Sequence, residues 1–489
     1  MGILSSSEPK EVFKYFEEIC AIPHGSGNTD AISNYLTDFA KSNNLKYIQD
    51  ESNNVIIFKD GTEGYEDSAP VMLQGHMDMV TVKDDGCDLN MENEGLRLRL
   101  EDGIISADGT SLGGDDGIAV AFALAILASN DISHPPLEAV FTVDEEIGML
   151  GATALDCSPL KSRIMLNLDS EEEGHLLVSC AGGATVTCRI PFEPEKPEED
   201  TVCVRVSVTG VTGGHSGTEI NKQGANACKL LGRFLNSVKT NLDYRLADIS
   251  GGLKDNAIPI YASALIILTN ESDIETLSEL AHDYTKVFQH EYLSTDENIC
   301  IETAKEVCPD SAMSFSDTES VISALVALPN GVQKMSNDFD GLVQTSLNLG
   351  IMSTVHSDEP HVSLSFSVRS SVSTEKYYLI EQLETITLLS NGSVDVSGEY
   401  PAWEFRKNSA LRDLMVDTFK DLYGKEPIVE SIHAGVECGI FASKLENLDC
   451  VSYGPDMTDI HTTNESMNVE SVKRTWEYTL EILRRLKQH

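Results

Sequence analysis

Apolar positions in the first part of the chain follow two alternating periods. Between residues 11 and 41 they recur at helical spacing, interrupted by a turn at residues 22–27. Short apolar runs then alternate with helical segments, which predicts an α/β domain with a largely parallel sheet flanked by helices. The expected strands are 54–58, 71–74, 137–143 and 163–168, and the expected central helix is 118–128.

The pattern changes character near Cys180. Residues 202–208 read Val-Cys-Val-Arg-Val-Ser-Val, a strict period of two that is typical of a sheet with one face in water. The further expected elements are helices at about 225–238, 273–290 and 375–389 and strands at about 257–267 and 361–368. Two strand-and-helix sets follow each other, so we expect residues 189–396 to form a separate α+β domain with two similar halves.

The last part of the chain returns to alternating strands and helices. The expected elements are a helix at 409–423, an apolar run at 428–432, a glycine-rich segment at 435–440 and a final helix at 469–486. A chain of 489 residues also exceeds the roughly 250–300 residues at which one hydrophobic core stops growing. The simplest account is one α/β domain built from residues 1–188 and 397–489, with the middle domain inserted.

The charge balance narrows the possible partners. The chain has 79 Asp and Glu against 35 Lys and Arg, a formal charge of −44. Such a polyanion repels nucleic acid and anionic membranes, because binding to either relies on Lys and Arg. No apolar run approaches the roughly 18 residues that cross a bilayer, and the 11 cysteines form no regular framework. We therefore expect a cytoplasmic protein with reduced thiols and with no nucleic-acid or membrane partner.

A histidine and an aspartate follow the second expected strand. They are His76 and Asp78, in the segment Gly75-His76-Met77-Asp78. In an extended chain, residues two apart face the same way, so Asp78 can hold one imidazole nitrogen of His76 while the other binds a metal. Alone, this pattern more often marks a hydrogen-bonded structural histidine.

Further candidate ligands occupy comparable positions. Asp115 precedes the central helix within Gly-Gly-Asp-Asp-Gly. Glu145 and Glu146 follow the third strand, Asp169 follows the fourth, and a loop far downstream supplies His461. Each group alone also fits an ordinary acidic loop or a helix cap. Together they form a nitrogen and oxygen donor set at the carboxyl ends of strands, where open α/β sheets bind ligands, and such a set suits zinc, cobalt or manganese.

The motifs around these residues resemble those of the M20 metallopeptidases, in particular the aminoacyl-histidine dipeptidase branch, over nearly the whole chain. They are GHMDMV (75–80), GGDDG (113–117), DEEIGMLGA (144–152), NLDSEEEG (167–174), GGHSGTEI (213–220), NAIP (256–259), VRSS (368–371), HAGVECG (433–439) and YGPDMTDIHTTNE (453–465). The resemblance implies that residues 1–188 and 397–489 form a zinc-peptidase-like catalytic domain. The inserted domain would then be a lid.

The resemblance also implies a centre of two divalent metal ions, with zinc as the first choice. Asp115 would bridge the two ions. His76 and Asp169 would complete one site, and Glu146 and His461 would complete the other.

Two more features of the catalytic domain follow from the resemblance. Asp78 would orient His76 without binding metal, and Glu145 would be the general base. The family also has a cis peptide at the position that matches Asp115 and Asp116.

Residues expected to contact the substrate lie mainly in the lid. His215 matches the family's lid histidine that stabilises the tetrahedral intermediate, and Asn256 and Arg369 match residues that hold the substrate carboxylate. The segment with Gly435 and Glu437 is expected to line the pocket for the substrate's amino end.

The predicted reaction is hydrolysis of the amide bond of small dipeptides. The resemblance implies Xaa-His dipeptides, including β-alanyl-histidine, with broad tolerance. An M20-type aminopeptidase or an N-acyl amino acid deacylase is the alternative. A metal-binding module without catalysis is a third reading, which the presence of Glu145 disfavours. Both a monomer and a homodimer fit the sequence.

Overall fold

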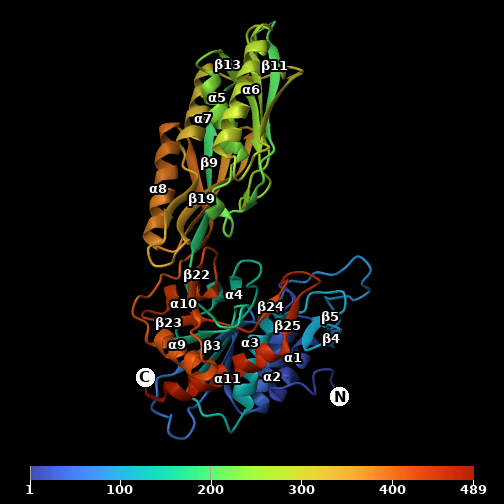
Figure 1. The fold of residues 1–489 in the computed structure, drawn as a ribbon, viewed down its shortest axis with the longest axis vertical. Coiled ribbons are helices and arrows are strands. Elements are labelled where there is room, and N and C mark those ends of the chain that lie inside the picture. Colours follow the sequence, from blue (N-terminus) through green and yellow to red (C-terminus); the bar gives the residue numbers. More distant parts are fainter. Residues whose placement is uncertain (1, 199, 489) are drawn as a thin grey trace. The chain divides into compact units, whose positions relative to one another are not determined.

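The computed structural model describes residues 2–198 and 200–488, which fold into two compact units (Figure 1). Unit 1 comprises Met1–Cys180, Phe405–Ser431 and Val436–His489, and unit 2 comprises Ala181–Glu404 and Ile432–Gly435. Both ends of the chain therefore build one unit, and the middle builds the other. The expected boundaries at 188/189 and 396/397 fall inside unit 2, because the residues on both sides of them pair as neighbouring strands of one sheet.

Eight strands form the main sheet of unit 1. They are β1 (Lys46–Gln49), β2 (Val55–Lys59), β3 (Val71–His76), β6 (Leu137–Thr142), β7 (Ile164–Asn167), β8 (His175–Cys180), β22 (Ile428–Ile432) and β23 (Asp449–Ser452). Their order is β1-β2-β6-β3-β7-β23-β8-β22. The central strands β6, β3, β7 and β23 are parallel, whereas β1, β2 and β8 pair antiparallel. The mixed α/β class is confirmed, and the four central strands form the parallel part of the sheet.

The helices of unit 1 include one that is buried almost throughout. The helices are α1 (Lys10–Cys20), α2 (Asp30–Ser42), α3 (Gly114–Ala128), α4 (Leu150–Ala154), α9 (Ala410–Tyr423), α10 (Glu437–Lys444) and α11 (Val469–Arg485). Every residue of α3 from Gly114 to Leu127 is buried, and this helix packs against both α1 and β3. An apolar sequence on all sides requires such a position, because a surface helix needs a polar face.

The contact between β3 and α3 depends on Gly75. A Cβ atom at Gly75 would lie 2.5 Å from the Cβ of Ala119 and 2.6 Å from Oδ2 of Asp116. Only a residue without a side chain lets the helix approach the strand so closely. The packing therefore brings the first turn of α3 next to the end of β3.

A second, four-stranded sheet of unit 1 holds the loop that carries His461. Its strands are β4 (Leu98–Glu101), β5 (Ile104–Ala107), β24 (Met457–Thr458) and β25 (Ser466–Asn468), in the order β24-β25-β5-β4. Antiparallel pairing of β24 with β25 closes the loop 459–465. Pairing of β25 with β5 attaches the base of this loop to the N-terminal part of the chain.

Unit 2 is built on one antiparallel sheet of nine strands. Eight of them follow the order β16-β11-β15-β13-β19-β20-β9-β21, and the ninth, β18, pairs with β19. Their bounds are β9 (Gly182–Pro191), β11 (Val202–Thr209), β13 (Tyr244–Gly251), β15 (Ala262–Leu268), β16 (Cys300–Glu306), β18 (Gly331–Met335), β19 (Val343–Val355), β20 (His361–Ser370) and β21 (Ser393–Tyr400). Only two residue pairs, Ser250–Ser353 and Gly251–Met352, join β13 to β19. The sheet therefore divides at this junction into a four-stranded group that ends with β13 and a five-stranded group that begins with β19 and includes β18.

Four helices bury one face of this sheet. They are α5 (Ala227–Val238), α6 (Asp273–Glu291), α7 (Phe315–Ala327) and α8 (Ser373–Leu389). Residues of β20 alternate strictly between buried and half-buried, as its period of two predicts. The buried side chains of both strand groups belong to one hydrophobic core, and α7 contacts β13 of one group and β9 of the other.

Short elements complete unit 2. They are β10 (Pro194–Glu195), β12 (Gly214–His215), β14 (Ala257–Ile258), β17 (Ala312–Met313) and the 3₁₀ turn Ile220–Lys222. β12 pairs with β14, which places His215 opposite Ala257. The expected strand 257–267 is thus split in two, because Ala257–Ile258 pairs with β12 in a separate two-stranded sheet and Ala262–Leu268 joins the nine-stranded sheet.

The expectation of reduced thiols throughout is wrong for one pair of cysteines. Cys203 in β11 and Cys308 form a disulfide, with their Cα atoms 5.1 Å apart. They are separated by 105 residues and meet because β11 pairs antiparallel with β16, just before Cys308. The sequence spacing of the cysteines does not reveal this pairing.

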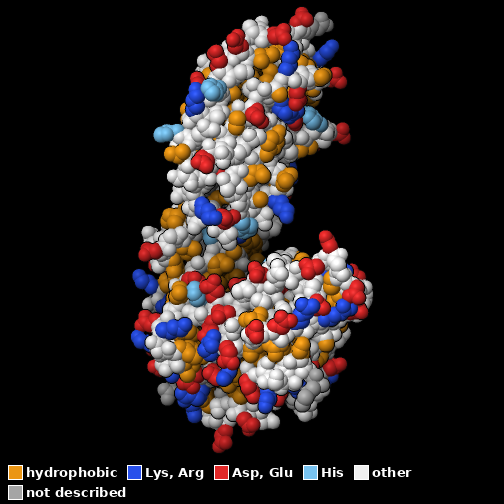
Figure 2. All heavy atoms as spheres, turned by 45° about the vertical axis from the view of Figure 1, so that its right-hand side comes forward, with side chains coloured by type: hydrophobic (Ala, Val, Ile, Leu, Met, Phe, Trp, Pro, Cys, Tyr) orange, Lys and Arg blue, Asp and Glu red, His pale blue; other side chains and the backbone are white. Residues whose placement is uncertain are grey.

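The excess of acidic residues and the short apolar runs of the sequence are both visible in the structure. On the face drawn in Figure 2, acidic side chains are dispersed over the surface among Lys and Arg, where water solvates them. Among the described residues, no helix combines the length and the apolar character that crossing a membrane requires.

We expect Gly75→Ala to lower the free energy of unfolding by about 1–3 kcal/mol, because the added methyl group collides with Ala119 and Asp116. Thermal or urea unfolding measures this change. Gly86→Ala is the matched control, because a Cβ atom there meets nothing within 4 Å. Equal stability of the two variants would contradict the close packing of α3 on β3.

Candidate active site

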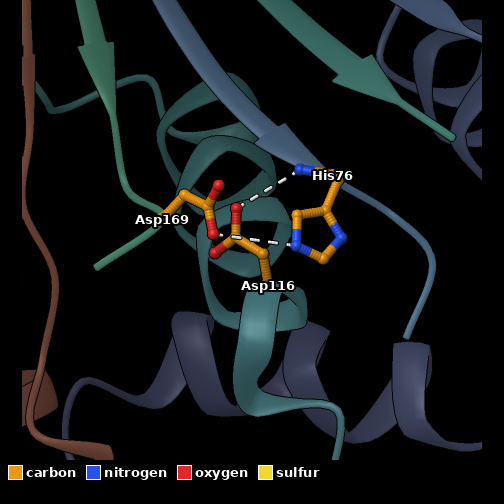
Figure 3. A group of neighbouring side chains, drawn as sticks. All are labelled: His76, Asp116 and Asp169. Carbon is orange, nitrogen blue, oxygen red and sulfur yellow. Dashed lines mark hydrogen bonds and ion pairs between the residues drawn. The ribbon is translucent and has the colours of Figure 1, made fainter. Parts of the chain in front are cut away.

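His76 ends β3 and is almost completely buried, with 1% of its surface exposed. Its Nε2 atom lies 3.1 Å from Oδ1 of Asp115 and 3.7 Å from Oδ1 of Asp169. Figure 3 shows the carboxylate of Asp169, which follows β7, facing the ring of His76. The parallel strands β3 and β7 deliver these two side chains to the same end of the sheet, as predicted.

Asp78 orients His76 through its backbone as well as its side chain. The Nδ1 atom of His76 lies 2.9 Å from the carbonyl oxygen of Asp78 and 3.5 Å from Oδ1 of its carboxylate. The carboxylate accepts hydrogen bonds from the hydroxyl of Ser26 and the backbone N–H of Glu145. Asp78 therefore holds the ring of His76 and also fastens the loop that carries Glu145.

Asp115 lies between two histidines. Its Oδ1 atom faces His76, and its Oδ2 atom lies 3.1 Å from Nε2 of His461. Burial raises the pKa of Asp115, but the hydrogen bonds with His461 and His76 outweigh this effect and hold the pKa below its ordinary value. The peptide bond between Asp115 and Asp116 is cis, as the family resemblance implied.

His461 joins Asp115 to Glu146. Its Nε2 atom lies 2.9 Å from Oε1 of Glu146, and the side chain is 45% exposed. Hydrogen bonds to Asp115 and Glu146 raise the pKa of His461 to about 10. The loop that carries His461 has a left-handed backbone at both Asp459 and His461.

Glu145 occupies the loop after β6, beside Glu146. Donor atoms of His76, Glu145 and Glu146 all lie within 4.8 Å of one another. Burial is the main cause that raises the pKa of Glu145 to about 9, and Asp169 adds to it, while His76 opposes it. The carboxyl group therefore favours the protonated form, and a nearby cation would shift it towards the carboxylate.

Asp116 is a buried carboxylate that the sequence interpretation did not assign. Its Oδ2 atom accepts a hydrogen bond from the backbone N–H of His76 at 3.2 Å (Figure 3). Its Oδ1 atom is buried without a hydrogen-bond partner among the described residues. Burial raises its pKa well above the ordinary value. Its position next to Asp115 in the motif was the only available signal.

Glu437, at the start of α10, is fully buried beneath this cluster. One carboxylate oxygen accepts hydrogen bonds from Gln74 at 2.5 Å and from Thr142 at 2.6 Å. Gln74 in turn accepts one from Asn167 at 2.5 Å. Gln74, Thr142 and Asn167 belong to β3, β6 and β7, respectively. The network therefore links the three strands that precede candidate ligands. A role in binding the substrate's amino end stays a prediction for Glu437.

The donor set fits divalent cations. The ion-pair partners of Asp115, Glu146 and Asp169 are His76 and His461, so buried carboxylates outnumber the groups that can neutralise them. Buried carboxylates repel one another unless a cation or a shared proton separates them. Three sets of donor atoms lie within 4.8 Å: His76, Asp116 and Asp169; His76, Glu145 and Glu146; and Asp115, Glu146 and His461. Nitrogen and oxygen donors of this kind suit zinc, cobalt or manganese.

The remaining predicted residues, apart from Glu437, belong to unit 2. His215 accepts hydrogen bonds at Nδ1 from the backbone of Gly217 and Thr218, and burial followed by the charge of Arg369 lowers its pKa. Asn256 is exposed, and its backbone carbonyl accepts a hydrogen bond from the backbone N–H of Ser216. The roles of His215, Asn256 and Arg369 in substrate binding stay predictions.

Sequence reasoning missed two residues that share this environment of unit 2. Tyr400 accepts a hydrogen bond from Arg369 at 3.1 Å, and Gly435 lies so close to Tyr400 that a Cβ atom would be 2.6 Å from its ring. His433 is buried, and its Nε2 atom lies 2.7 Å from the hydroxyl of Ser346. Burial, followed by the charge of Arg369, lowers the pKa of His433 to about 4. The HAGVECG motif was the available signal for His433.

The chain is similar to known peptidases in both sequence and structure. The sequence profile of Peptidase family M20/M25/M40 matches residues 72–485. The chain is 33% identical to the cytosol non-specific dipeptidase of Escherichia coli (strain K12) over 486 residues, which cover 99% of each protein. The structure is similar to that of the aminoacylhistidine dipeptidase from Vibrio alginolyticus, with a TM-score of 0.92, 32% identity and coverage of 99% of this chain and 98% of that one.

A more distant similarity extends to a tripeptidase from Staphylococcus aureus, with a TM-score of 0.57, 16% identity and full coverage of both chains. At this identity the likeness concerns the fold alone. The residues that match the profile make up most of the chain, and all five predicted metal ligands lie within this range. The chain belongs to the M20/M25/M40 family of peptidases.

Proposed function

We propose that the protein is a dipeptidase that uses two divalent metal ions to hydrolyse the amide bond of small dipeptides. The observation that carries this proposal is the position of Asp115, whose two carboxylate oxygens each face a different histidine at 3.1 Å. A carboxylate in this position can hold two cations side by side. The names of the relatives in Escherichia coli and Vibrio alginolyticus, both dipeptidases, support the substrate class.

The proposed ligands divide into two groups around Asp115. His76 and Asp169 hold one ion, and Glu146 and His461 hold the other. When bound, the two ions lower the pKa of a water molecule and polarise the scissile carbonyl group. Asp78 fixes the ring of His76 in the orientation that leaves Nε2 free for its ligand role.

Glu145 is the proposed general base and acid. It lies within 4.8 Å of donor atoms of His76 and Glu146, and its backbone is held by Asp78. Its carboxylate would take a proton from the attacking water and then donate it to the leaving amine. Burial favours the protonated carboxyl group, which is the form needed for the second of these steps.

The proposal extends to the preferred substrate, the identity of the metal and the location of the protein in the cell. We propose activity on Xaa-His dipeptides with broad tolerance, because one relative is named for aminoacylhistidine and another is called non-specific. Zinc is the first candidate metal, with cobalt and manganese as alternatives. A cytoplasmic location agrees with the name of the Escherichia coli relative. A deacylase or aminopeptidase of the same family is the competing activity.

Replacing Glu145 by Gln should reduce kcat on a dipeptide by about 10²–10⁴-fold, because the amide cannot accept the proton. The metal content should stay at the wild-type value, because Glu145 is not a proposed ligand. Steady-state kinetics and elemental analysis of the same preparations measure both quantities. Glu172→Gln, at an exposed acid that is not a predicted site residue, is the control. Normal turnover or lost metal in Glu145→Gln would reject its role.

Replacing His461 by Ala should remove one of the two bound ions per chain, because His461 is the nitrogen donor of only one group. Replacing His76 should affect the other ion. Elemental analysis after equilibration with limiting zinc gives the stoichiometry, and His282→Ala, at an exposed histidine of unit 2, is the control. Full metal content in His461→Ala would exclude it as a ligand.

Removing the metal with a chelator should abolish dipeptide hydrolysis, and refilling with zinc, cobalt or manganese should restore it to different extents. A panel of Xaa-His, other dipeptides and N-acetyl amino acids then defines the substrate class. The highest kcat/KM is expected on dipeptides that have a free amino end. Faster hydrolysis of N-acetyl amino acids would instead support the deacylase.

A further inference from the structure

The first turn of α3 has no capping group of its own. Its N-cap residue is Gly113, which has no side chain, and the backbone of Asp115 and Asp116 is non-helical. The buried N–H groups of this irregular start of the helix therefore need acceptors. The carboxylate of Glu465 supplies them from the far end of the chain. It faces the backbone N–H groups of Leu112 at 2.8 Å, Gly113 at 3.1 Å, Gly114 at 2.8 Å and Asp115 at 3.5 Å.

Glu465 belongs to the same loop as His461. This loop, residues 459–465, runs between β24 and β25, and the pairing of these strands holds its base. Thr463 donates a second bond from the loop to Asp84, at 2.6 Å. Unlike His461, Glu465 is buried, with 3% of its surface exposed. The carboxylate is thus the deepest anchor of an otherwise exposed loop.

The two ends of this contact carry two proposed ligands of the same ion. Asp115 is the last residue of the backbone segment that faces Glu465, and His461 lies four residues before Glu465. Their side chains face each other at 3.1 Å. A shift of the loop relative to α3 would change that separation without changing either ligand.

Only a carboxylate satisfies this position fully. Both of its oxygens accept bonds, each from two neighbouring N–H groups. A glutamine would turn an N–H₂ group towards backbone donors and would lose the negative charge that strengthens bonds from N–H groups. A plain helix cap would explain the bonds to α3, but it would not explain why the cap comes from the His461 loop.

We propose that Glu465 is a positioning residue that sets the spacing between Asp115 and His461 and thereby the affinity of the site for its second metal ion. The inference rests on the proposed two-metal function. In the described part of the chain, the hydrogen bonds of the Glu465 carboxylate go to backbone N–H groups and not to the side chain of a predicted ligand. Its effect reaches the ion through the backbone of α3 on one side and through the 459–465 loop on the other.

The test compares Glu465→Gln and Glu465→Asp with wild type and with Glu470→Gln. Glu470 is an exposed acid five residues further on, in the first turn of α11, and is the matched control. Metal-free protein is titrated with cobalt(II), and the visible absorption bands report the filling of each site. Circular dichroism of the metal-free proteins checks folding, and kcat is measured at limiting and at excess metal.

We expect Glu465→Gln to bind the first ion nearly as wild type does and the second about 10–100-fold more weakly. Excess metal should restore most of kcat, which a general loss of stability would not do. Glu465→Asp keeps the charge, and its affinity for the second ion should lie between those of wild type and Glu465→Gln. Glu470→Gln should match wild type.

Two results would overturn the inference. One is wild-type affinity for both ions in Glu465→Gln, and the other is a low kcat that persists with both sites filled. If Glu465→Gln does not fold, Glu465→Asp decides in the same way. Weaker binding of the second ion supports the inference, and unchanged binding overturns it. A wild-type chain that binds fewer than two ions would instead reject the proposed function itself.

Discussion

The organisation of unit 1 depends on the mutual repulsion of buried carboxylates at the carboxyl ends of its central strands. Asp115, Glu146 and Asp169 converge there, and among the described residues their ion-pair partners are His76 and His461. Carboxylates in such surroundings are costly unless cations neutralise them. The metal ions proposed for this cluster would neutralise it, and Asp115, with one oxygen towards each histidine, is the point where its two halves meet.

The rest of unit 1 holds these groups at short range. Gly75 lets α3 approach β3, which brings Asp115 and Asp116 to His76. The bonds of Asp78 to Ser26 and to the backbone of Glu145 connect the N-terminal turn with the loop after β6. Hydrogen bonds through Gln74 and Glu437 tie the strands together below the cluster. Packing, backbone hydrogen bonds and buried polar contacts thus fix the positions of the same candidate ligand side chains, which is what a metal site requires.

Local sequence predicted much of this arrangement. The apolar runs before His76, Glu145 and Asp169 marked strands, and parallel strands necessarily bring their following residues to one end of a sheet. The apolar sequence around α3 marked it as a buried helix. The family motifs supplied what periodicity did not, namely that the distant His461 belongs with Asp115. Domain boundaries were less predictable, because both expected ones fall where strands of unit 2 continue through them.

The sequence by itself determined the alternation of elements and predicted an inserted domain and a set of candidate metal ligands, because each depends on short-range patterns or on motifs. Only the tertiary structure decided which groups hold those residues. Glu465 binds the start of α3 across 350 residues of chain, and Cys203 meets Cys308 across 105. Glu437 reaches Gln74 across 363. Such contacts follow from how strands and loops pack in space, and no local spacing records them.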